Sequence, residues 1–218
     1  MPAKATRKPR KPDPAKARER VLDTALRLAA ERPWDRVSLP DLAAAADLSL
    51  ADLYALYPTR QSILRAIIAR TDQRVLDETP PPGEGESVRD RLFDILMRRF
   101  DALSEHRAGI LSMARATARD PLAALTTVPS TMRSMAWMLE AAGVPAAGPC
   151  GGLRVKGLAA VYAAAFRTWA GDDSPDMART MAAVDRFLAR AEKLSAACAR
   201  RGPGRAASDA PVAEAEAG

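Results

Sequence analysis

The sequence contains few of the residues from which enzymes build nucleophilic and metal-binding sites. Its 218 residues include a single histidine, His106, and two cysteines, Cys150 and Cys198, whose spacing fits neither a metal site nor a redox motif. His106 stands without a paired cysteine or carboxylate, and no glycine-rich phosphate loop is present. We therefore expect no catalytic residues, no cofactor and no bound metal, and a protein that is not an enzyme.

Long apolar runs and β-branched residues are also scarce. The most apolar late segment, residues 153–171, is interrupted by Lys156 and Arg167, so it does not read as a membrane span. The basic N-terminus is not followed by the apolar run of a signal peptide, which favours a cytoplasmic protein. Alanine is abundant within a hydrophobic content of 48%. This composition predicts an all-α fold.

Positive charge is concentrated at one end of the chain. Residues 1–20 hold eight Lys/Arg against two Asp/Glu, which accounts for the whole formal net charge of +6. Because residues 1–13 are rich in Lys, Arg and Pro, we expect them to form a disordered basic arm. Such an arm can neutralise phosphates or enter a minor groove, or it can be a solvated tail. The sequence leaves both readings open.

Residues 38–64 predict two short helices joined by a tight turn. Ser38 is suited to cap the first helix and Ser49 the second. Pro58 ends the second helix, and Thr59 caps the longer helix that follows. Two short helices joined by three residues and flanked by longer ones are typical of a helix-turn-helix.

The same stretch resembles the DNA-binding signature of the TetR family of bacterial repressors. The residues that carry the resemblance are Ser38, Leu42, Ala43, Ala46, Leu48, Ser49, Leu53, Tyr54, Tyr57, Thr59 and Arg60. The resemblance covers roughly residues 18–72. It implies a homodimeric regulator with a small DNA-binding head and a larger helical body that binds a ligand and dimerises.

Carried over by position, the family pattern implies a set of DNA-binding residues. Capping hydroxyls would face phosphates, the start of the second motif helix would face base edges, and later residues would hold the backbone. The set is Ser38, Leu39, Ser49, Leu50, Ala51, Asp52, Tyr54, Tyr57, Thr59 and Arg60. Plain helix capping by Ser38 and Thr59, and core packing by the two tyrosines, are the structural alternatives.

The reading helix departs from the family pattern in its charge. Asp52 stands where the family usually has Thr or Ser, and a carboxylate repels phosphate unless it accepts from a cytosine amino group. Leu56 replaces a His or Tyr that commonly reaches the backbone. No Lys or Arg lies between Arg36 and Arg60. The affinity for DNA would then come from the basic arm and from Arg60.

Residues 79–86, which contain three successive prolines and two glycines, mark a break between the head and the rest of the chain. We expect a basic arm, a helix-turn-helix domain with a linking helix, a helical ligand-binding and dimerisation domain, and a disordered tail. Their predicted bounds are residues 1–13, 14–79, 87–198 and 199–218.

The last two long helices, of which the final one starts at Ser174-Pro175, should pair with their copies in a four-helix bundle. Gly157, Ala160 and Ala164 recur at helical spacing. These small residues would allow close approach between the two copies, or they could pack within one subunit.

Seven of the eight methionines lie beyond residue 90, together with most of the aromatic residues. Methionine adapts to a flexible apolar guest, and helical proteins bind ligands between facing helices. An ordinary core is the alternative. We predict a small apolar or lipid-like effector, with His106 and Arg167 as candidate polar anchors. The predicted contacts are Phe100, Met113, Met135, Trp137, Met138, Tyr162, Phe166 and Trp169.

Residues 91–103, 132–144 and 161–192 are also similar to the ubiquinone-biosynthesis lipid-binding protein family. Those proteins share the TetR fold, have lost DNA binding and hold an isoprenoid lipid in the body. Two functions therefore follow from resemblance. The first is a TetR-type regulator at a palindromic operator, and the second is a lipid-binding accessory protein of quinone metabolism.

Overall fold

The structure is a computed structural model that describes residues 13–148 and 150–200, with the backbone alone over residues 194–200. The predicted arm and tail lie outside these residues except at their inner ends. Within the described residues all regular structure is helical, which confirms the all-α prediction. The elements are α1 (Pro14–Glu31), η1 (Trp34–Arg36), α2 (Leu39–Ala45), α3 (Leu50–Leu56), α4 (Arg60–Glu78), α5 (Val88–Ser104), α6 (Arg107–Arg119), α7 (Pro121–Ala141), α8 (Gly151–Ala170) and α9 (Ala178–Arg200).

Side-chain caps determine where the first four α-helices begin. The side-chain oxygens of Asp13, Ser38, Ser49 and Thr59 each accept a hydrogen bond from a backbone N–H in the first turn of α1, α2, α3 and α4 respectively. Each bond satisfies an N–H group that has no partner within its helix. Three of the four caps stand at the serines and threonine at which the sequence predicts helix starts.

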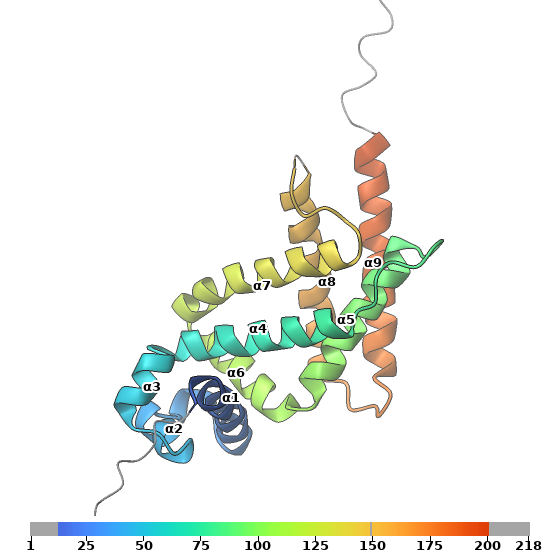
Figure 1. The fold of residues 1–218 in the computed structure, drawn as a ribbon. Helices are drawn as coiled ribbons and strands as arrows, with labels where there is room; N and C mark the ends of the chain where they lie inside the picture. Colours follow the sequence, from blue (N-terminus) through green and yellow to red (C-terminus); the bar gives the residue numbers. More distant parts are fainter. Residues whose placement is uncertain (1–12, 149, 201–218) are drawn as a thin grey trace, which may run out of the picture.

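Helices α1, α2 and α3, with η1 and the first half of α4, form a compact unit that we call the head (Figure 1). Its core includes Val21, Leu42, Leu53 and Ile63, all at most 1% exposed. Helix α6 contributes Met113 to the same cluster. The head is therefore completed by a helix that follows it by more than thirty residues in the sequence.

Helix α4 is shared between the head and the remaining helices, which we call the body. Ile63 and Ile67 pack in the head cluster, whereas Val75 packs in a second cluster with residues of α5, α7, α8 and α9. Figure 1 shows α4 crossing from one part to the other as a single helix. A shift of α4 within the body therefore moves the head.

A buried ion pair fastens α4 to the body. Arg99 of α5 donates to the Oδ1 atom of Asp72 on α4, and Ser134 of α7 donates to the Oδ2 atom at 2.6 Å. The Arg99 guanidinium lies 5.1 Å from the centre of the Tyr162 ring on α8. Burial lowers the pKa of Arg99, but the neighbouring Tyr162 and Asp72 outweigh it and hold that pKa above its usual value. Four helices thus meet at one charged pair.

Gly109 brings α6 directly onto α1. A Cβ atom at Gly109 would lie 2.3 Å from the carbonyl oxygen of Leu26, so no larger residue fits unless the two helices separate. Ser112, which is also on α6, accepts a hydrogen bond at 3.0 Å from the backbone N–H of Trp34 in η1. The head is therefore joined to the body at two places, through α4 and through α6.

The segment after α4 is attached to the body by Arg91 of α5. Its Nε atom donates to the Ala141 carbonyl at 2.8 Å, and its two amino groups donate to Glu86 and to the Pro80 carbonyl. The Arg91 side chain is 6% exposed. Residues 79–86 thus interrupt the helices while remaining bonded to the helix that follows them.

The last helix begins at Ala178, later than the predicted start at Ser174-Pro175. The buried Asp172 carboxylate accepts from the backbone N–H and the hydroxyl of Thr180 at 2.7 and 2.6 Å, and from the hydroxyl of Ser174. Burial raises the pKa of Asp172, but the hydrogen bonds lower it by a larger amount, so the pKa of this carboxyl group is well below its usual value. The carboxylate holds the intervening residues in a turn, and the helix starts after it.

The buried pair makes a clear prediction for stability. Replacing Asp72 by alanine leaves the Arg99 charge buried without its partner, so we expect the free energy of unfolding to fall by about 3–5 kcal/mol. The double variant Asp72→Leu/Arg99→Leu should recover most of this loss because it removes both charges. Urea denaturation at one fixed protein concentration measures all three proteins. Glu31→Ala, which breaks an exposed pair with Arg27, is the control and should change stability by less than about 1 kcal/mol.

The close contact of α6 with α1 leads to a second prediction for stability. The expected change is opposite in sign to the one that helix propensity alone would give. Alanine normally stabilises a helix by about 0.5–1 kcal/mol relative to glycine. Gly109→Ala should nevertheless destabilise the protein by about 1–3 kcal/mol, because the added methyl group meets the backbone of α1. Gly152→Ala on α8, whose added methyl group meets nothing within 4 Å, is the matched control. Thermal or urea unfolding that showed equal effects for the two variants would disprove the close packing of α6 on α1.

Candidate nucleic-acid interface

Helices α2 and α3 are joined by a turn with the geometry of a helix-turn-helix. Asp47 takes a φ of 54°, in the left-handed region, and the N–H of Leu48 bonds back to the Ala43 carbonyl at 2.9 Å. Asp tolerates this conformation better than most residues because its short side chain is polar. Leu42 and Leu53, on the two helices, are at most 1% exposed and pack in the head core. The turn and this packing set the angle at which α3 leaves the head.

The outer face of α3 carries two large, exposed side chains. Leu50 is 52% exposed and Tyr54 is 69% exposed, and Ala51 beside them is exposed as well. Residues four apart lie on the same side of a helix, so Leu50 and Tyr54 form one continuous surface. Of the predicted base-facing residues, Leu50 and Ala51 therefore face outward, and Tyr54 joins them.

Asp52, the third predicted base-facing residue, is bonded within its own helix. Its Oδ2 atom accepts from the hydroxyl of Ser49 at 2.6 Å, and its backbone N–H donates to the same hydroxyl oxygen at 3.0 Å. The side chain is only half exposed. The negative charge of Asp52 thus stabilises α3, because it lies at the N-terminus of the helix, where the helix dipole is positive.

The three capping hydroxyls differ in what they can still donate. The Ser49 hydroxyl gives its proton to Asp52. Thr59 only accepts, from the backbone N–H of Ser62, so within the described residues its hydroxyl proton has no acceptor in the protein. The Ser38 side chain is hydrogen-bonded to the Asp41 carboxylate, which lowers the pKa of Asp41. Thr59 can therefore donate to a phosphate oxygen while it caps its helix, whereas the hydroxyls of Ser38 and Ser49 already bond to carboxylates of their own helices.

Arg60 and Leu39 are turned toward the head. One amino group of Arg60 donates to the carbonyl oxygens of Trp34 and Asp35, both at 3.2 Å, and its guanidinium lies 5.9 Å from the centre of the Trp34 ring. Leu39 is half buried against the head core. Arg60 therefore ties the start of α4 to η1 as well as carrying a positive charge at the head surface.

Tyr57 occupies a different environment from Tyr54. It is 6% exposed, packs in the head cluster and lies under the Arg18 guanidinium, 5.7 Å from the ring centre. Burial raises the pKa of the Tyr57 hydroxyl above its ordinary value. The structure places Tyr57 in the core and Tyr54 on the surface, which separates two residues that the sequence pattern treats alike.

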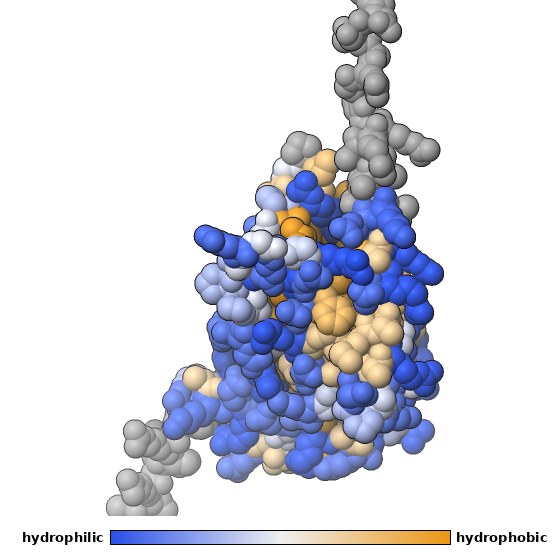
Figure 2. Space-filling view, turned by 90° about the vertical axis from the view of Figure 1, so that its right-hand side faces the viewer, coloured by the Kyte–Doolittle hydropathy of each residue, from blue (hydrophilic) through white to orange (hydrophobic). Residues whose placement is uncertain are grey.

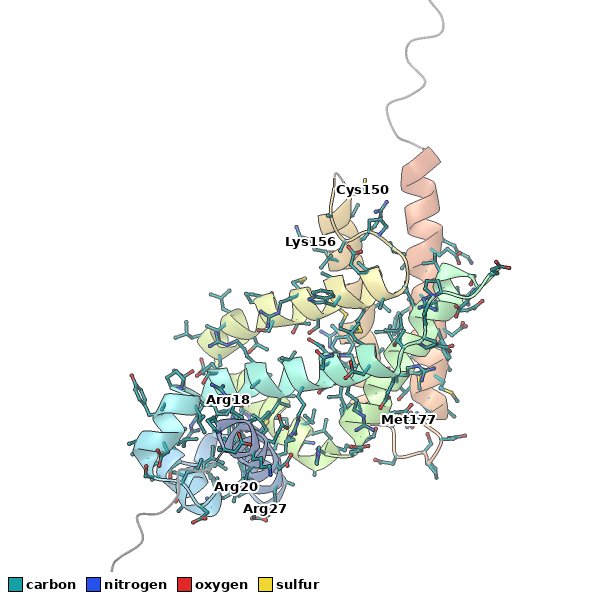
Figure 3. All side chains as sticks on the ribbon, in the orientation of Figure 1. Arg18, Arg20, Arg27, Cys150, Lys156 and Met177 are labelled. Atoms are coloured by element: carbon teal, nitrogen blue, oxygen red, sulfur yellow. The ribbon has the colours of Figure 1, made fainter. Side chains whose placement is uncertain are left out.

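Besides Arg60 of α4 and Arg32, which pairs with Asp41 of α2, several cations at the head end of the molecule come from α1. Figure 3 labels Arg18, Arg20 and Arg27 on this helix, and Lys16 is exposed beside them. Residues 1–12, which hold five further Lys/Arg, precede α1 directly but lie outside the described residues. Positive charge is therefore carried next to the helix-turn-helix and not on α2 or α3.

Six of the eight predicted ligand contacts gather in the body. Rings and methionines from α5, α7 and α8 pack in one cluster, with ring centroids 5.2–6.0 Å apart. The six are Phe100, Met135, Met138, Tyr162, Phe166 and Trp169.

The other two predicted ligand contacts lie elsewhere. Met113 packs in the head cluster, because it lies on the face of α6 that meets α1. Trp137 is 54% exposed, because it is one helical position away from the buried Met138 and points outward. Neither residue lies with the six body residues, so neither forms part of the candidate effector site.

The sequence interpretation missed the charged pair beside this cluster. Asp72, Arg99 and Ser134 are all buried. The signal was present in the spacing, because Arg99 falls on the apolar stripe of α5 and Asp72 lies between apolar neighbours of α4 at helical intervals. One charge on each of two apolar helix faces indicates a buried ion pair.

Two clefts lie where the head meets the body. A cleft of about 620 Å³ opens between α1, η1 and α6, and one of about 220 Å³ lies between α1, α4, α5 and α6. None of the eight predicted ligand contacts lines either cleft, although His106 lines the smaller one. These clefts are separate from the aromatic cluster of the body.

Comparison with known proteins agrees with the geometry of the head. Residues 21–67 match the family model described as bacterial regulatory proteins, tetR family. No curated protein matches the chain. The matched residues extend from the second turn of α1 to the middle of α4 and include the whole helix-turn-helix.

Solved structures extend the likeness to the body. A TetR transcriptional regulator from Nitrosomonas europaea is 26% identical, with a TM-score of 0.68, over 83% of this chain and 99% of that one. One from Rhodococcus sp. RHA1 is 20% identical, with a TM-score of 0.63, over 82% of this chain and 97% of that one. A tetR-family regulator from Streptomyces coelicolor is 22% identical, with a TM-score of 0.57, over 84% and 83%.

The fold and the head define a helix-turn-helix protein with a helical body. The family match over residues 21–67 and the structure from Nitrosomonas europaea support a TetR-type transcriptional regulator, and they do not favour the lipid-binding alternative. Within residues 13–148 and 150–200, no helix has the length and apolar character needed to cross a membrane.

The contrast between the two tyrosines is directly testable. Tyr57→Ala empties a buried site and should lower the free energy of unfolding by about 3 kcal/mol or more. Tyr54→Ala removes an exposed side chain and should change it by less than about 0.5 kcal/mol. Chemical denaturation of both variants measures the difference. Equal losses would show that α3 is not oriented as described.

Proposed function

We propose that the protein is a homodimeric, ligand-responsive repressor that binds a palindromic DNA operator. The observation that carries this proposal is the outer face of α3, where Leu50 and Tyr54 are exposed on a helix whose opposite face is buried at Leu53. A short, firmly anchored helix with an exposed face is suited to enter a major groove. No catalytic role forms part of the proposal.

The dimer interface is proposed on α8 and α9. Figure 2 shows the molecule from the side on which α9 lies, with apolar residues gathered between hydrophilic ones. Gly157 and Ala160 of α8 and Met181 of α9 are exposed, and a Cβ on Gly157 would meet nothing within 4 Å inside the subunit. Gly157 and Ala160 are thus available for close approach by a second copy, which favours the four-helix bundle over packing within one subunit.

Phosphate binding is proposed to come from two sources. Thr59 retains a hydroxyl proton to donate, and the cations of α1 and the basic arm supply charge. In a symmetric dimer, the two α3 helices must lie one DNA turn apart, about 34–36 Å, to reach both half-sites. Repression or activation at the promoter then depends on where the operator lies.

The effector is proposed to be a small apolar or lipid-like molecule held at the aromatic cluster of the body. Phe100 and Trp169 are fully buried and their ring centroids are 6.0 Å apart, so a guest must part the rings or replace one of them. Tyr162 and Phe166 are half-buried and complete the aromatic lining of this candidate effector site. The methionines of α7 in this cluster give it an adaptable side.

Effector binding would reach the head through α4. Tyr162 of the cluster lies against Arg99, and Arg99 is bonded to Asp72 of α4. An effector that moves Tyr162 therefore acts on the residue that holds α4 in place. Such a ligand weakens DNA binding only if it binds better to the state with the wrong head spacing.

Selection of preferred sequences from random duplex DNA, using the full-length protein, tests the proposal. We expect one palindromic sequence with two half-sites separated by about one helical turn. The affinity for this sequence should fall steeply with salt. Removal of residues 1–12 should reduce the salt slope by about 0.9 for each phosphate that the arm neutralises. Fluorescence anisotropy at several salt concentrations provides these values.

Two variants serve as controls for that measurement. Tyr54→Ala should weaken binding to the selected sequence while sparing nonspecific binding. Leu122→Ala, which changes a 70% exposed side chain on α7, should alter neither. Recovery of no preferred sequence would reject the regulator function, and binding as a monomer would reject the bundle of α8 and α9.

A further inference from the structure

The reading surface of this protein has an unusual chemical inventory. Between Arg36 and Arg60 the sequence contains no Lys, Arg, His, Asn, Gln or Glu. The polar side chains of this stretch are three aspartates and a few hydroxyls. This matters because each base pair presents a distinct set of groups in the major groove, and particular side chains read particular groups.

Most of the usual base-specific hydrogen bonds are therefore closed to α3. Guanine is read by Arg or Lys, and adenine by Asn or Gln, through paired hydrogen bonds in the major groove. None of these residues stands on α2 or α3. The reading helix thus cannot make the bidentate hydrogen bonds that specify purines.

Cytosine remains as a target for a carboxylate, because its amino group donates in the major groove. Asp52 is the acidic residue of α3, but its Oδ2 atom is held by the Ser49 hydroxyl at 2.6 Å and its backbone N–H returns to the same hydroxyl oxygen. Rotation of Asp52 toward a base would break its bond to Ser49. One of the two carboxylate oxygens of Asp52 is therefore already engaged within α3, which disfavours recognition of cytosine.

What the helix does offer is apolar surface. Leu50 and Tyr54 are 52% and 69% exposed, and Ala51 lies between them on the exposed side. Four helical residues span about 6 Å, close to two base-pair steps of about 3.4 Å. The one apolar group in the major groove is the C5-methyl group of thymine, and apolar side chains contact it.

Resting on the proposed regulator function, we propose that α3 recognises its operator by the C5-methyl groups of thymine. Leu50, Ala51 and Tyr54 are the specificity-determining residues, and the core of each half-site contains T·A pairs at adjacent positions. Sequence discrimination comes from methyl burial on α3. Phosphate affinity comes from other elements, namely the cations of α1 and the basic arm.

The test replaces single thymines of the selected operator by deoxyuridine, which removes the methyl group and leaves base pairing unchanged. At the thymines that face α3, we expect affinity to fall about fourfold for each methyl group, the effect of one buried CH₂ group. The methyl group lies in the major groove, so binding of the arm in the minor groove does not respond to this change. Competition binding with full-length protein measures it.

Leu50→Ala links the effect to α3. In this variant, deoxyuridine at one thymine of each half-site should no longer lower the DNA affinity. At the other thymines the loss of affinity should persist. Leu122→Ala on α7 removes an exposed leucine outside the helix-turn-helix and should leave every deoxyuridine effect unchanged. Unfolding transitions equal to that of the unsubstituted protein show that both variants remain folded.

Three results would overturn the proposal. If deoxyuridine has no effect at any position of a clearly selected operator, methyl readout is wrong while the regulator function stands. If 7-deazaguanine, which lacks the N7 acceptor, costs more affinity than deoxyuridine, guanine is read instead, by a cation outside α3. Failure to select any operator would remove both the readout and the regulator function.

Discussion

The buried pair of Asp72 and Arg99 is the interaction on which the relation between head and body depends. Neither charge can be left alone in the interior, because desolvation of an unpaired ion costs several kcal/mol. Ser134 and Tyr162 occupy the remaining sides of the pair, so α4, α5, α7 and α8 are held in one register. Since α4 begins at the helix-turn-helix and continues into this site, the position of the head is set by the chemistry of the body.

A second, apolar constraint acts on the other side of the head. Gly109 allows α6 to touch the backbone of α1, and Met113 enters the head core from the same helix. The head is thus supported by one charged and one steric interaction, on two different helices. Motion of either helix alone would break packing or strand a charge, so the two move together or not at all. A switch between two head spacings would therefore have to move both helices together.

Much of the head could be predicted from local sequence, because Ser38, Ser49 and Thr59 cap helices through bonds to residues three positions away. The roles of the side chains could not. Arg60 turns toward the carbonyls of Trp34 and Asp35, and Tyr57 enters the core beside Arg18, through interactions with residues far away in the sequence. In the body, composition predicted an apolar cluster, but only the packing of α6 on α1 assigns Met113 to the head.

The separation of charge from the reading helix has a consequence for regulation. A helix that carries arginines can grip one half-site through phosphates and bases together, whereas α3 offers the exposed Leu50 and Tyr54 and no cation. In the proposed dimer, one head alone would therefore add little sequence-dependent affinity, and tight binding would need both heads in register on the same face of the duplex. Because the two contributions would combine through that dimer, a change in head spacing would remove the contribution of the second head. A weakly reading helix thus makes the regulator more sensitive to the position of α4, and hence to the state of the Asp72–Arg99 pair.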